Sequence, residues 1–307
     1  MPKMKFVSKN ISPDRLKVID QANEIVEEYA EQGFGLTLRQ LYYQFVARDL
    51  MKNTFRNYKR LGDIISDGRL AGLIDWNAID DRLREMHGHA HWSSPGGIVE
   101  ACAQQFRYDL WSDQPYHVEV WVEKDALSGI VAQAAGALDV GYLVCRGFAS
   151  QTALWEAGQR LRNKAANGKK PVVLHLGDHD PSGMDMTRDN RDRTSMFARD
   201  AVRFERIALN MDQIEQYEPP PNAAKESDSR AAGYIAEYGE SSWELDALDP
   251  KVLADIIKKN IDRFRDKKLF AARLAEQDEA REQLTTVARR WERCCELIND
   301  EPEADEE

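Results

Sequence analysis

The chain has 307 residues, of which 42% are apolar and 31% charged, a composition typical of a soluble globular protein. No apolar run approaches the roughly 20 residues that a transmembrane helix needs, which argues against a membrane-spanning protein. The formal net charge of −11 argues mildly against nucleic acid as a partner, and the absence of an apolar signal core near Met1 predicts a cytoplasmic location.

The charge is unevenly distributed along the chain. The last eight residues, 300–307, hold six acids and no base, and they predict an acidic tail. In contrast, the stretch from residue 39 to residue 60 holds six bases against Asp49 alone. A solvated helix face would explain this basic patch as well as a DNA-binding surface would. The candidate DNA contacts in the patch are Arg48, Lys52, Arg56, Lys59 and Arg60.

Residues 1–92 are predicted to form an all-α-rich, winged-helix-like DNA-binding domain. Apolar residues recur at helical spacing over residues 13–32, and Thr37 is a suitable N-cap for a second helix. A third helix and a short extended segment follow, an order that is typical of helix-turn-helix modules. Residues 93–115 are expected to be a linker. The alternating His87, His89 and His91 before it are better explained by a solvated loop than by a metal site.

Two adjacent tyrosines in the second helix are predicted to differ in their roles. Tyr42 belongs to an apolar stripe at positions i, i+3, i+4 and i+7, so it is expected in the core. Tyr43 is turned about 100° away and shares its face with Arg39, so it is expected to be a partly exposed phenol beside a guanidinium. Tyr43 is therefore a candidate nucleophile. The alternative is an aromatic side chain that stacks on DNA without reacting.

Residues 116–250 are predicted to form an α/β domain with a parallel sheet flanked by helices. The strand-like runs "HVEVWV", "GYLVC" and "PVVLHLG" alternate with helical segments, and "FERIAL" is a candidate fourth strand. A charged helical extension is expected over residues 251–299.

Three acids follow the predicted strands at their carboxyl ends, where open parallel sheets build their sites. Glu123 follows the first strand, and Asp178 and Asp180 follow the third, two residues apart and therefore on one side. Such carboxylates predict a Mg²⁺ (or Mn²⁺) site, with Glu123 as a second metal ligand or a general acid/base. The alternative is a set of solvated acids that cap helices. His179, between the aspartates, is expected to pack on the opposite side.

Several segments, in the family's order, resemble the A subunit of topoisomerase VI and the related meiotic double-strand-break proteins. "WVEKDAL", then "LVCRGFAS", then "GDHDPSGMDM" resemble their Toprim domain with its glutamate and Asp-x-Asp motifs, and "LRQLYY" resembles the tyrosine segment of their winged-helix domain. "RLAGLI" and "WELDAL" resemble two shorter motifs, so the resemblance spans about residues 30–250.

The resemblance implies Mg²⁺-dependent DNA cleavage by a homodimer, in which a tyrosine of one protomer attacks a phosphodiester at the metal site of the other. The implied nucleophile is Tyr43, with Arg39 as the motif arginine and Glu123, Asp178 and Asp180 at the metal. Lys124 and Arg146, near this site, are further candidate DNA contacts. Gln40 stands where the family usually has an acid.

The resemblance also implies partners. Double-stranded DNA is the expected substrate. Topoisomerase activity would require a separate ATPase subunit, since the sequence contains no G-x-x-x-x-G-K-[ST] motif.

Two other functions stay open on the sequence. A Toprim-type nuclease could use water in place of Tyr43, and a DNA-binding accessory protein could carry a vestigial site. Near the Pro-rich segment, Lys225, Asp228 and Arg230 are expected either to contact the DNA backbone or to form salt bridges with the sheet domain.

Overall fold

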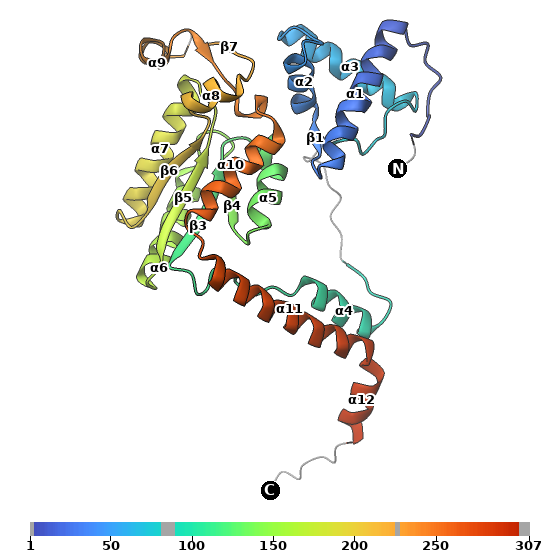
Figure 1. Cartoon of the computed structure of the whole chain (residues 1–307), viewed down its shortest axis with the longest axis vertical. Helices are drawn as coiled ribbons and strands as arrows, with labels where there is room; N and C mark the ends of the chain where they lie inside the picture. Colours follow the sequence, from blue (N-terminus) through green and yellow to red (C-terminus); the bar gives the residue numbers. More distant parts are fainter. Residues whose placement is uncertain (1–2, 81–89, 225–227, 301–307) are drawn as a thin grey trace. The chain divides into compact units, whose positions relative to one another are not determined.

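The computed structural model describes residues 3–80, 90–224 and 228–300 (Figure 1). The chain divides into two compact units, of which the first comprises residues 1–84 and 116–264 and the second residues 85–115 and 265–307. In the described ranges, no helix is both long and apolar enough to cross a membrane.

The N-terminal part of the first unit is mainly helical. It contains α1 (Pro13–Glu31), β1 (Leu36–Thr37), α2 (Leu38–Ala47), α3 (Phe55–Leu70) and β2 (Ile79–Asp80), and β1 pairs with β2 in parallel. Thr37 caps α2 as predicted: its hydroxyl accepts a hydrogen bond from the Gln40 amide, and the Gln40 side chain accepts one from the Thr37 amide. Gln40, the departure from the family pattern, therefore has a capping role.

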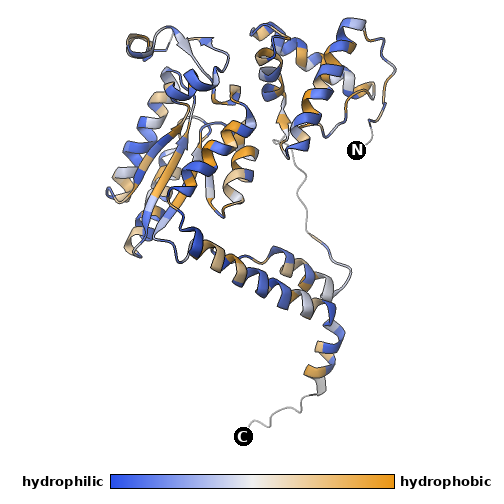
Figure 2. Cartoon of the chain, in the orientation of Figure 1, coloured by the Kyte–Doolittle hydropathy of each residue, from blue (hydrophilic) through white to orange (hydrophobic). Residues whose placement is uncertain are grey.

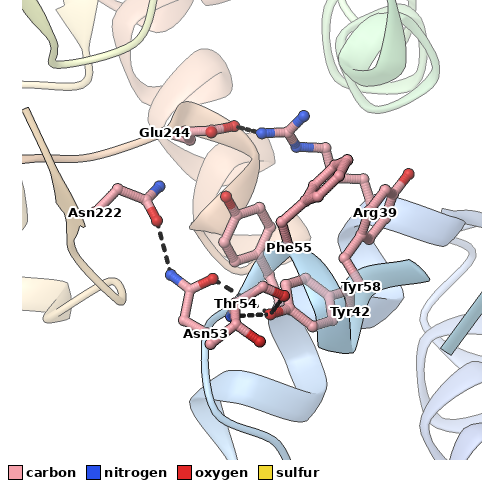
Figure 3. Close-up of a pocket in the computed structure, with 9 residues that line it drawn as sticks. Arg39, Tyr42, Asn53, Thr54, Phe55, Tyr58, Asn222 and Glu244 are labelled. Carbon is pink, nitrogen blue, oxygen red and sulfur yellow. Dashed lines mark hydrogen bonds and ion pairs between the residues drawn. The ribbon is translucent and has the colours of Figure 1, made fainter. Parts of the chain in front are cut away.

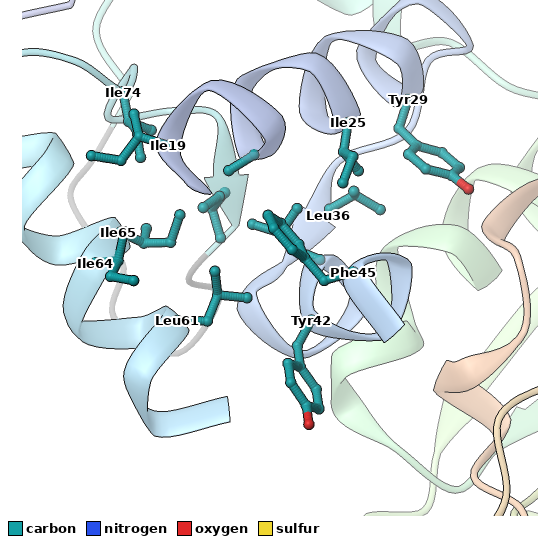
Figure 4. Close-up of a cluster of buried hydrophobic side chains, with 13 residues drawn as sticks. Ile19, Ile25, Tyr29, Leu36, Tyr42, Phe45, Leu61, Ile64, Ile65 and Ile74 are labelled. Atoms are coloured by element: carbon teal, nitrogen blue, oxygen red, sulfur yellow. The ribbon is translucent and has the colours of Figure 1, made fainter. Parts of the chain in front are cut away.

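An apolar cluster holds these helices together (Figure 4). Ile19 and Ile25 from α1 meet Phe45 from α2 and Leu61 from α3. Tyr42 belongs to the same cluster with only 4% of its surface exposed, which confirms its predicted place in the core. Its hydroxyl donates to the Thr54 carbonyl at 2.9 Å and accepts from the Thr54 amide at 2.7 Å, so the polar end of this ring is satisfied.

The remainder of the first unit is built on a four-stranded parallel sheet, as predicted. The strands β3 (Tyr116–Val122), β4 (Gly141–Val144), β5 (Lys170–Leu176) and β6 (Arg203–Ala208) lie in the order β4-β3-β5-β6. Both central strands carry runs of consecutive buried residues, as strands covered on both faces require. Figure 2 shows hydrophobic residues in the strands of this sheet. The connecting helices are α5 (Ser128–Gly136), α6 (Gln151–Ala166) and α7 (Pro181–Ala198), and α10 (Pro250–Asp262) packs against α5.

Short elements after β6 return to the carboxyl end of the sheet. They are α8 (Met211–Tyr217), β7 (Asn222–Ala223), α9 (Ala231–Tyr238), β8 (Ser241–Ser242) and the 3₁₀ turn η2 (Leu245–Ala247); another 3₁₀ turn, η1 (Asp125–Leu127), follows β3. His179 exchanges two backbone hydrogen bonds with Trp243, of 2.8 and 2.9 Å. These bonds bring the segment before η2 beside the end of β5.

The second unit is helical. It contains α4 (Pro95–Gln105), α11 (Lys267–Arg289) and α12 (Trp291–Asp300), and α4 packs along α11. The buried Gln277 of α11 accepts a hydrogen bond from the Tyr108 amide at 2.9 Å. Residues 93–115, expected to be a linker, thus contain a helix and pack with part of the predicted C-terminal extension.

One partly buried ion pair in the first unit gives a pH-dependent prediction. Arg160 of α6 donates two hydrogen bonds of 2.8 Å to Glu119 of β3. Burial alone would raise the pKa of Glu119, but the hydrogen bonds from Arg160 and His117 outweigh it and lower this pKa to about 2. The stabilisation that the ionised pair contributes is therefore fully present above the unfolded-state pKa of about 4.3 and is lost as the pH falls towards 2.

We expect Arg160→Met to reduce the free energy of unfolding by about 2 kcal/mol at pH 7, less than for a fully buried pair because Arg160 is 44% exposed. Urea denaturation at pH 7 and pH 3 measures the effect, which should shrink at the lower pH. Arg162→Met on the same helix is the control. A loss from Arg160→Met that is equal at both pH values would contradict the account.

A close contact between α6 and α7 gives a second stability prediction. A Cβ atom at Gly158 would collide with the side chain of Phe197 and approach its carbonyl carbon to 3.0 Å. Gly158→Ala should therefore destabilise the fold by about 1–3 kcal/mol through overpacking. Gly136→Ala, where a Cβ atom meets nothing within 4 Å, should be neutral or slightly stabilising. Thermal unfolding of both variants tests the difference, and equal melting temperatures would be inconsistent with it.

Candidate active site

Two of the three predicted metal ligands meet at the carboxyl ends of the neighbouring strands β3 and β5. Glu123 directly follows β3, and Asp178 lies two residues beyond the end of β5. The Asp178 amide donates a hydrogen bond of 3.0 Å to Glu123 Oε2. Both side chains are buried, at 7% and 6% exposure. The parallel register, in which Val122 pairs with Leu176, is what brings the two acids together.

Asp180 stands at the start of α7 and caps it. Its Oδ1 accepts a hydrogen bond of 2.6 Å from the Gly183 amide, so helix capping is a real role of this acid. A Cβ atom at Gly183 would collide with the Asp178 carbonyl oxygen, which explains the glycine in the first turn of the helix. Among the described residues, Asp180 Oδ2 accepts no hydrogen bond, so this oxygen is open to a ligand.

A second pair of acids joins the cluster from η2 and the residue before it. Lys124 forms ion pairs with Asp178 Oδ2 at 2.8 Å, Glu244 Oε2 at 2.8 Å and Asp246 Oδ1 at 3.0 Å. Glu244 and Asp246 were not among the site residues predicted from the sequence. The sequence feature that could have indicated them is the "WELDAL" motif, which contains both. Lys124, a candidate DNA contact, lies within the cluster with 21% of its side chain exposed.

The surroundings of Glu123 and Asp178 disfavour the ionised form of both carboxyls. Burial, and then the charge of Asp178, raise the pKa of Glu123. Burial also raises the pKa of Asp178, although Lys124 acts in the opposite direction. Burial would lower the pKa of Lys124, but the surrounding carboxylates outweigh it and raise this pKa. The nearby cations therefore do not offset the effect of burial on the pKa of either Glu123 or Asp178.

Counting charges shows what the cluster lacks. Three cations face five carboxylates, so two negative charges would be uncompensated with all five ionised, which is the charge of one divalent ion. The carboxylates are Glu123, Asp178, Asp180, Glu244 and Asp246, and the cations are Arg39, Lys124 and Arg206. Arg206 donates hydrogen bonds to the carbonyl oxygens of Gly177 and Asp178, at 2.9 and 2.7 Å.

The donor set fits a hard divalent cation such as Mg²⁺, because every candidate ligand is a carboxylate oxygen. Among the described residues, Glu123 Oε1 accepts no hydrogen bond, so it is open to a ligand like Asp180 Oδ2. The oxygens of Asp178 are engaged by Lys124 and by the Leu245 amide. Accordingly, in the described ranges no three acids, histidines or cysteines already stand in a metal-binding arrangement. A metal bound through Asp178 Oδ2 would compete with Lys124 for this oxygen.

Tyr43 is buried, with 3% of its surface exposed, so the expectation of a partly exposed phenol is wrong. Helical periodicity predicts only the face of α2 that packs against the other N-terminal helices. Residues outside that face can still be buried, because η2 also packs against α2. The Tyr43 ring lies beside Arg39, whose Cζ is 5.9 Å from the ring centroid. A pocket of about 230 Å³ adjoins the two residues, and Asn222 and Glu244 line it together with side chains from α2 and α3 (Figure 3).

Arg39 connects Tyr43 to the acidic cluster. It forms an ion pair with Glu244 (Figure 3) and another with Asp246 Oδ2 at 3.0 Å. Burial, Glu244 and Asp246 raise the pKa of Tyr43, while a hydrogen bond with Asn222 and the charge of Arg39 lower it by less. The Tyr43 phenol is therefore protonated at neutral pH, and Arg39 is paired with the carboxylates of Glu244 and Asp246.

The other predicted DNA contacts lie on the surface. Arg48 is exposed and pairs with Glu28 at 2.8 Å, and Arg146 is exposed and pairs with Asp125 at 3.3 Å. The remaining members of the basic patch are also exposed, on α3 and the segment before it: Lys52, Arg56, Lys59 and Arg60. Their roles in binding DNA stay a prediction.

Several secondary expectations can also be placed. His179 is buried, and its Nδ1 lies 2.7 Å from the Tyr234 hydroxyl, which confirms its packing role. His87 and His89 lie outside the described residues, and His91 is exposed. Lys225 is also outside them. Arg230 forms ion pairs with Asp228 and with Asp185 of α7, in agreement with the salt-bridge alternative.

The fold and the site define an α/β protein in which the carboxyl ends of a four-stranded parallel sheet carry a buried acidic cluster. Comparisons with protein-family models, curated proteins and solved structures found no match. The function is therefore inferred from the residues of the site and their chemistry.

Proposed function

We propose that the protein is a Mg²⁺-dependent, DNA-cleaving enzyme with a Toprim-type acidic site, similar to the A subunit of topoisomerase VI. One observation carries the proposal. Glu123 and Asp178 meet at the ends of adjacent parallel strands, and the ion pairs of Arg39 link this cluster to the candidate nucleophile Tyr43. A buried acidic cluster with raised pKa values beside a phenol and a guanidinium suits phosphoryl chemistry better than a structural role.

In this proposal Glu123, Asp178 and Asp180 hold the metal. Mg²⁺ there would neutralise a DNA phosphate and make its phosphorus open to attack. Arg39 would exchange its carboxylate partners for that phosphate, which a guanidinium can hold through two hydrogen bonds. Its charge, freed from Glu244 and Asp246, would then favour the phenolate.

The reaction would transfer a DNA phosphorus from a deoxyribose oxygen to the phenol oxygen of Tyr43. The Tyr43 phenol oxygen forms a bond to phosphorus, and the bond from phosphorus to a deoxyribose oxygen breaks. The phenol loses its proton and the leaving oxygen gains one. If Asp178 and Asp180 hold the metal without Glu123, the raised pKa of Glu123 makes it the candidate for that proton transfer. The product is a phosphotyrosine ester and a free deoxyribose hydroxyl.

The proposal includes the assembly that the resemblance implies. The N-terminal helices would be a winged-helix-like module that binds double-stranded DNA, and two protomers would pair as a homodimer. The resemblance implies that each tyrosine serves the metal site of the other protomer, whereas the ion pairs of Arg39 favour attack at the metal site of the same chain. The exposed basic residues around α3 support a DNA-facing role for this region. Strand passage would need a separate ATPase subunit.

A hydrolytic reaction at the same site is the second candidate. The burial of Tyr43 and its raised pKa favour it, because a protonated phenol is a poor nucleophile. Water would then attack the phosphate and leave no protein attached to DNA.

Incubation of the chain with supercoiled plasmid tests the proposed function. We expect nicked or linear DNA with Mg²⁺ or Mn²⁺, and none when EDTA is present. A plasmid that stays supercoiled with both metals would argue for the third function, a DNA-binding accessory protein.

A further inference from the structure

The pocket beside Tyr43 has walls suited to a flat, polar-edged ring. Four aromatic side chains, Tyr42, Tyr43, Phe55 and Tyr58, line it together with the amides of Asn53 and Asn222 (Figure 3). Its volume of about 230 Å³ lies below the roughly 300–1,000 Å³ typical of pockets for drug-sized ligands. It is therefore of a size for one ring system and not for a large molecule.

Phe55 is the unusual member of this lining. Its side chain is 72% exposed, although Tyr42 and Tyr58 beside the pocket are fixed by an edge-to-face contact with centroids 5.5 Å apart. Packing does not require a phenylalanine at so exposed a position. The Lys59 ammonium lies 4.7 Å from the centroid of the Phe55 ring. Exposed aromatic rings among cations are the combination with which proteins bind unpaired nucleotides.

The amides supply polar groups at the pocket. The Asn53 amide nitrogen donates to Asn222 Oδ1 at 2.8 Å, so the two side chains form one polar wall across segments distant in the sequence. Amides offer both donors and acceptors, which is what the edge of a nucleobase requires. Arg39 lines the same pocket and would lie near a phosphate attached to a base held there.

We propose that this pocket takes one unstacked nucleobase of the DNA, next to the phosphate that Tyr43 attacks. Phe55 and Tyr58 would stack on the base, and Asn53 and Asn222 would bind its edge. This inference rests on the proposed function, since it assumes a DNA substrate. A base inside a regular duplex is stacked on both faces and enters only if it is flipped out at a cost in stacking and pairing, so the preferred substrate contains an unpaired nucleotide.

Fluorescence anisotropy in EDTA, where no cleavage interferes, tests the inference. The probes are a labelled perfect duplex and the same duplex with one unpaired 2-aminopurine. We expect the wild type to bind the bulged duplex more tightly and to quench the 2-aminopurine emission by stacking. Phe55→Ala should weaken binding of the bulged duplex about ten-fold, with little change for the perfect duplex. Trp155→Ala, another half-exposed aromatic that does not line this pocket, should change neither.

The outcomes separate the two proposals. Equal binding of both duplexes by the wild type, or unchanged binding by Phe55→Ala, would overturn the base pocket. If plasmid cleavage that depends on Asp178 is still observed in that case, the proposed function stands without it. If the wild type binds neither duplex and does not cleave plasmid, both the base pocket and the proposed function are overturned. Circular dichroism checks that Phe55→Ala is folded, which its exposure leads us to expect.

Discussion

Replacing Asp178 with asparagine should reduce Mg²⁺-dependent DNA cleavage by at least about 10³-fold, because a metal ligand supplies several kcal/mol of transition-state stabilisation. Asparagine preserves the size of the side chain and an oxygen for the Leu245 amide. The loss would therefore reflect the missing charge. The measurement is the initial rate of plasmid cleavage at saturating Mg²⁺.

The same variant should be at least as stable as the wild type at pH 7. The folded-state pKa of Asp178 is raised, so ionisation of this carboxyl destabilises the folded chain as the pH rises through that pKa. Asparagine removes this destabilisation. A variant that is inactive but at least as stable as the wild type is typical of a functional residue whose presence lowers stability. Asp192→Asn, on the exposed face of α7, should leave cleavage unchanged. Normal cleavage by Asp178→Asn would exclude both the covalent and the hydrolytic mechanism, since each places the metal on Asp178.

Tyr43→Phe should reduce cleavage by at least about 10³-fold if its phenol is the nucleophile, since the ring stays and the attacking oxygen is removed. Tyr42→Phe is the matched control. It should retain cleavage and lose about 1 kcal/mol of stability, because the ring stays and only the hydrogen bonds of its hydroxyl, with Lys52, Asn53 and Thr54, disappear. Cleavage rates and urea denaturation of both variants provide the comparison. A Tyr43→Phe protein that cuts DNA at the normal rate would establish the hydrolytic alternative.

The sheet and its acids were predictable because they depend on local patterns. Apolar strands that alternate with helices predict a parallel sheet, and the acids that end two of those strands are then close in space. No contact between distant segments is needed for that inference. The register of β3 with β5 confirms it for Glu123 and Asp178.

The rest of the site depends on tertiary contacts that local patterns do not contain. Glu244 and Asp246 reach the cluster because the backbone of Trp243 pairs with that of His179, far away in the sequence. The burial of Tyr43 has the same origin, since η2 covers a helix face that periodicity assigned to solvent. The pairing of α4 with α11 likewise joins segments that the sequence separates by a whole domain.

The central claim is that the oxygen of Tyr43 becomes covalently bound to DNA, and trapping that bond tests it most directly. End-labelled DNA is incubated with the protein and Mg²⁺, the reaction is stopped with detergent, and the label is followed on a denaturing gel. We predict label that migrates with the 35.1 kDa chain, and a nucleotide adduct that mass spectrometry locates on Tyr43. Cleaved DNA with free ends and no label on the protein would contradict the account.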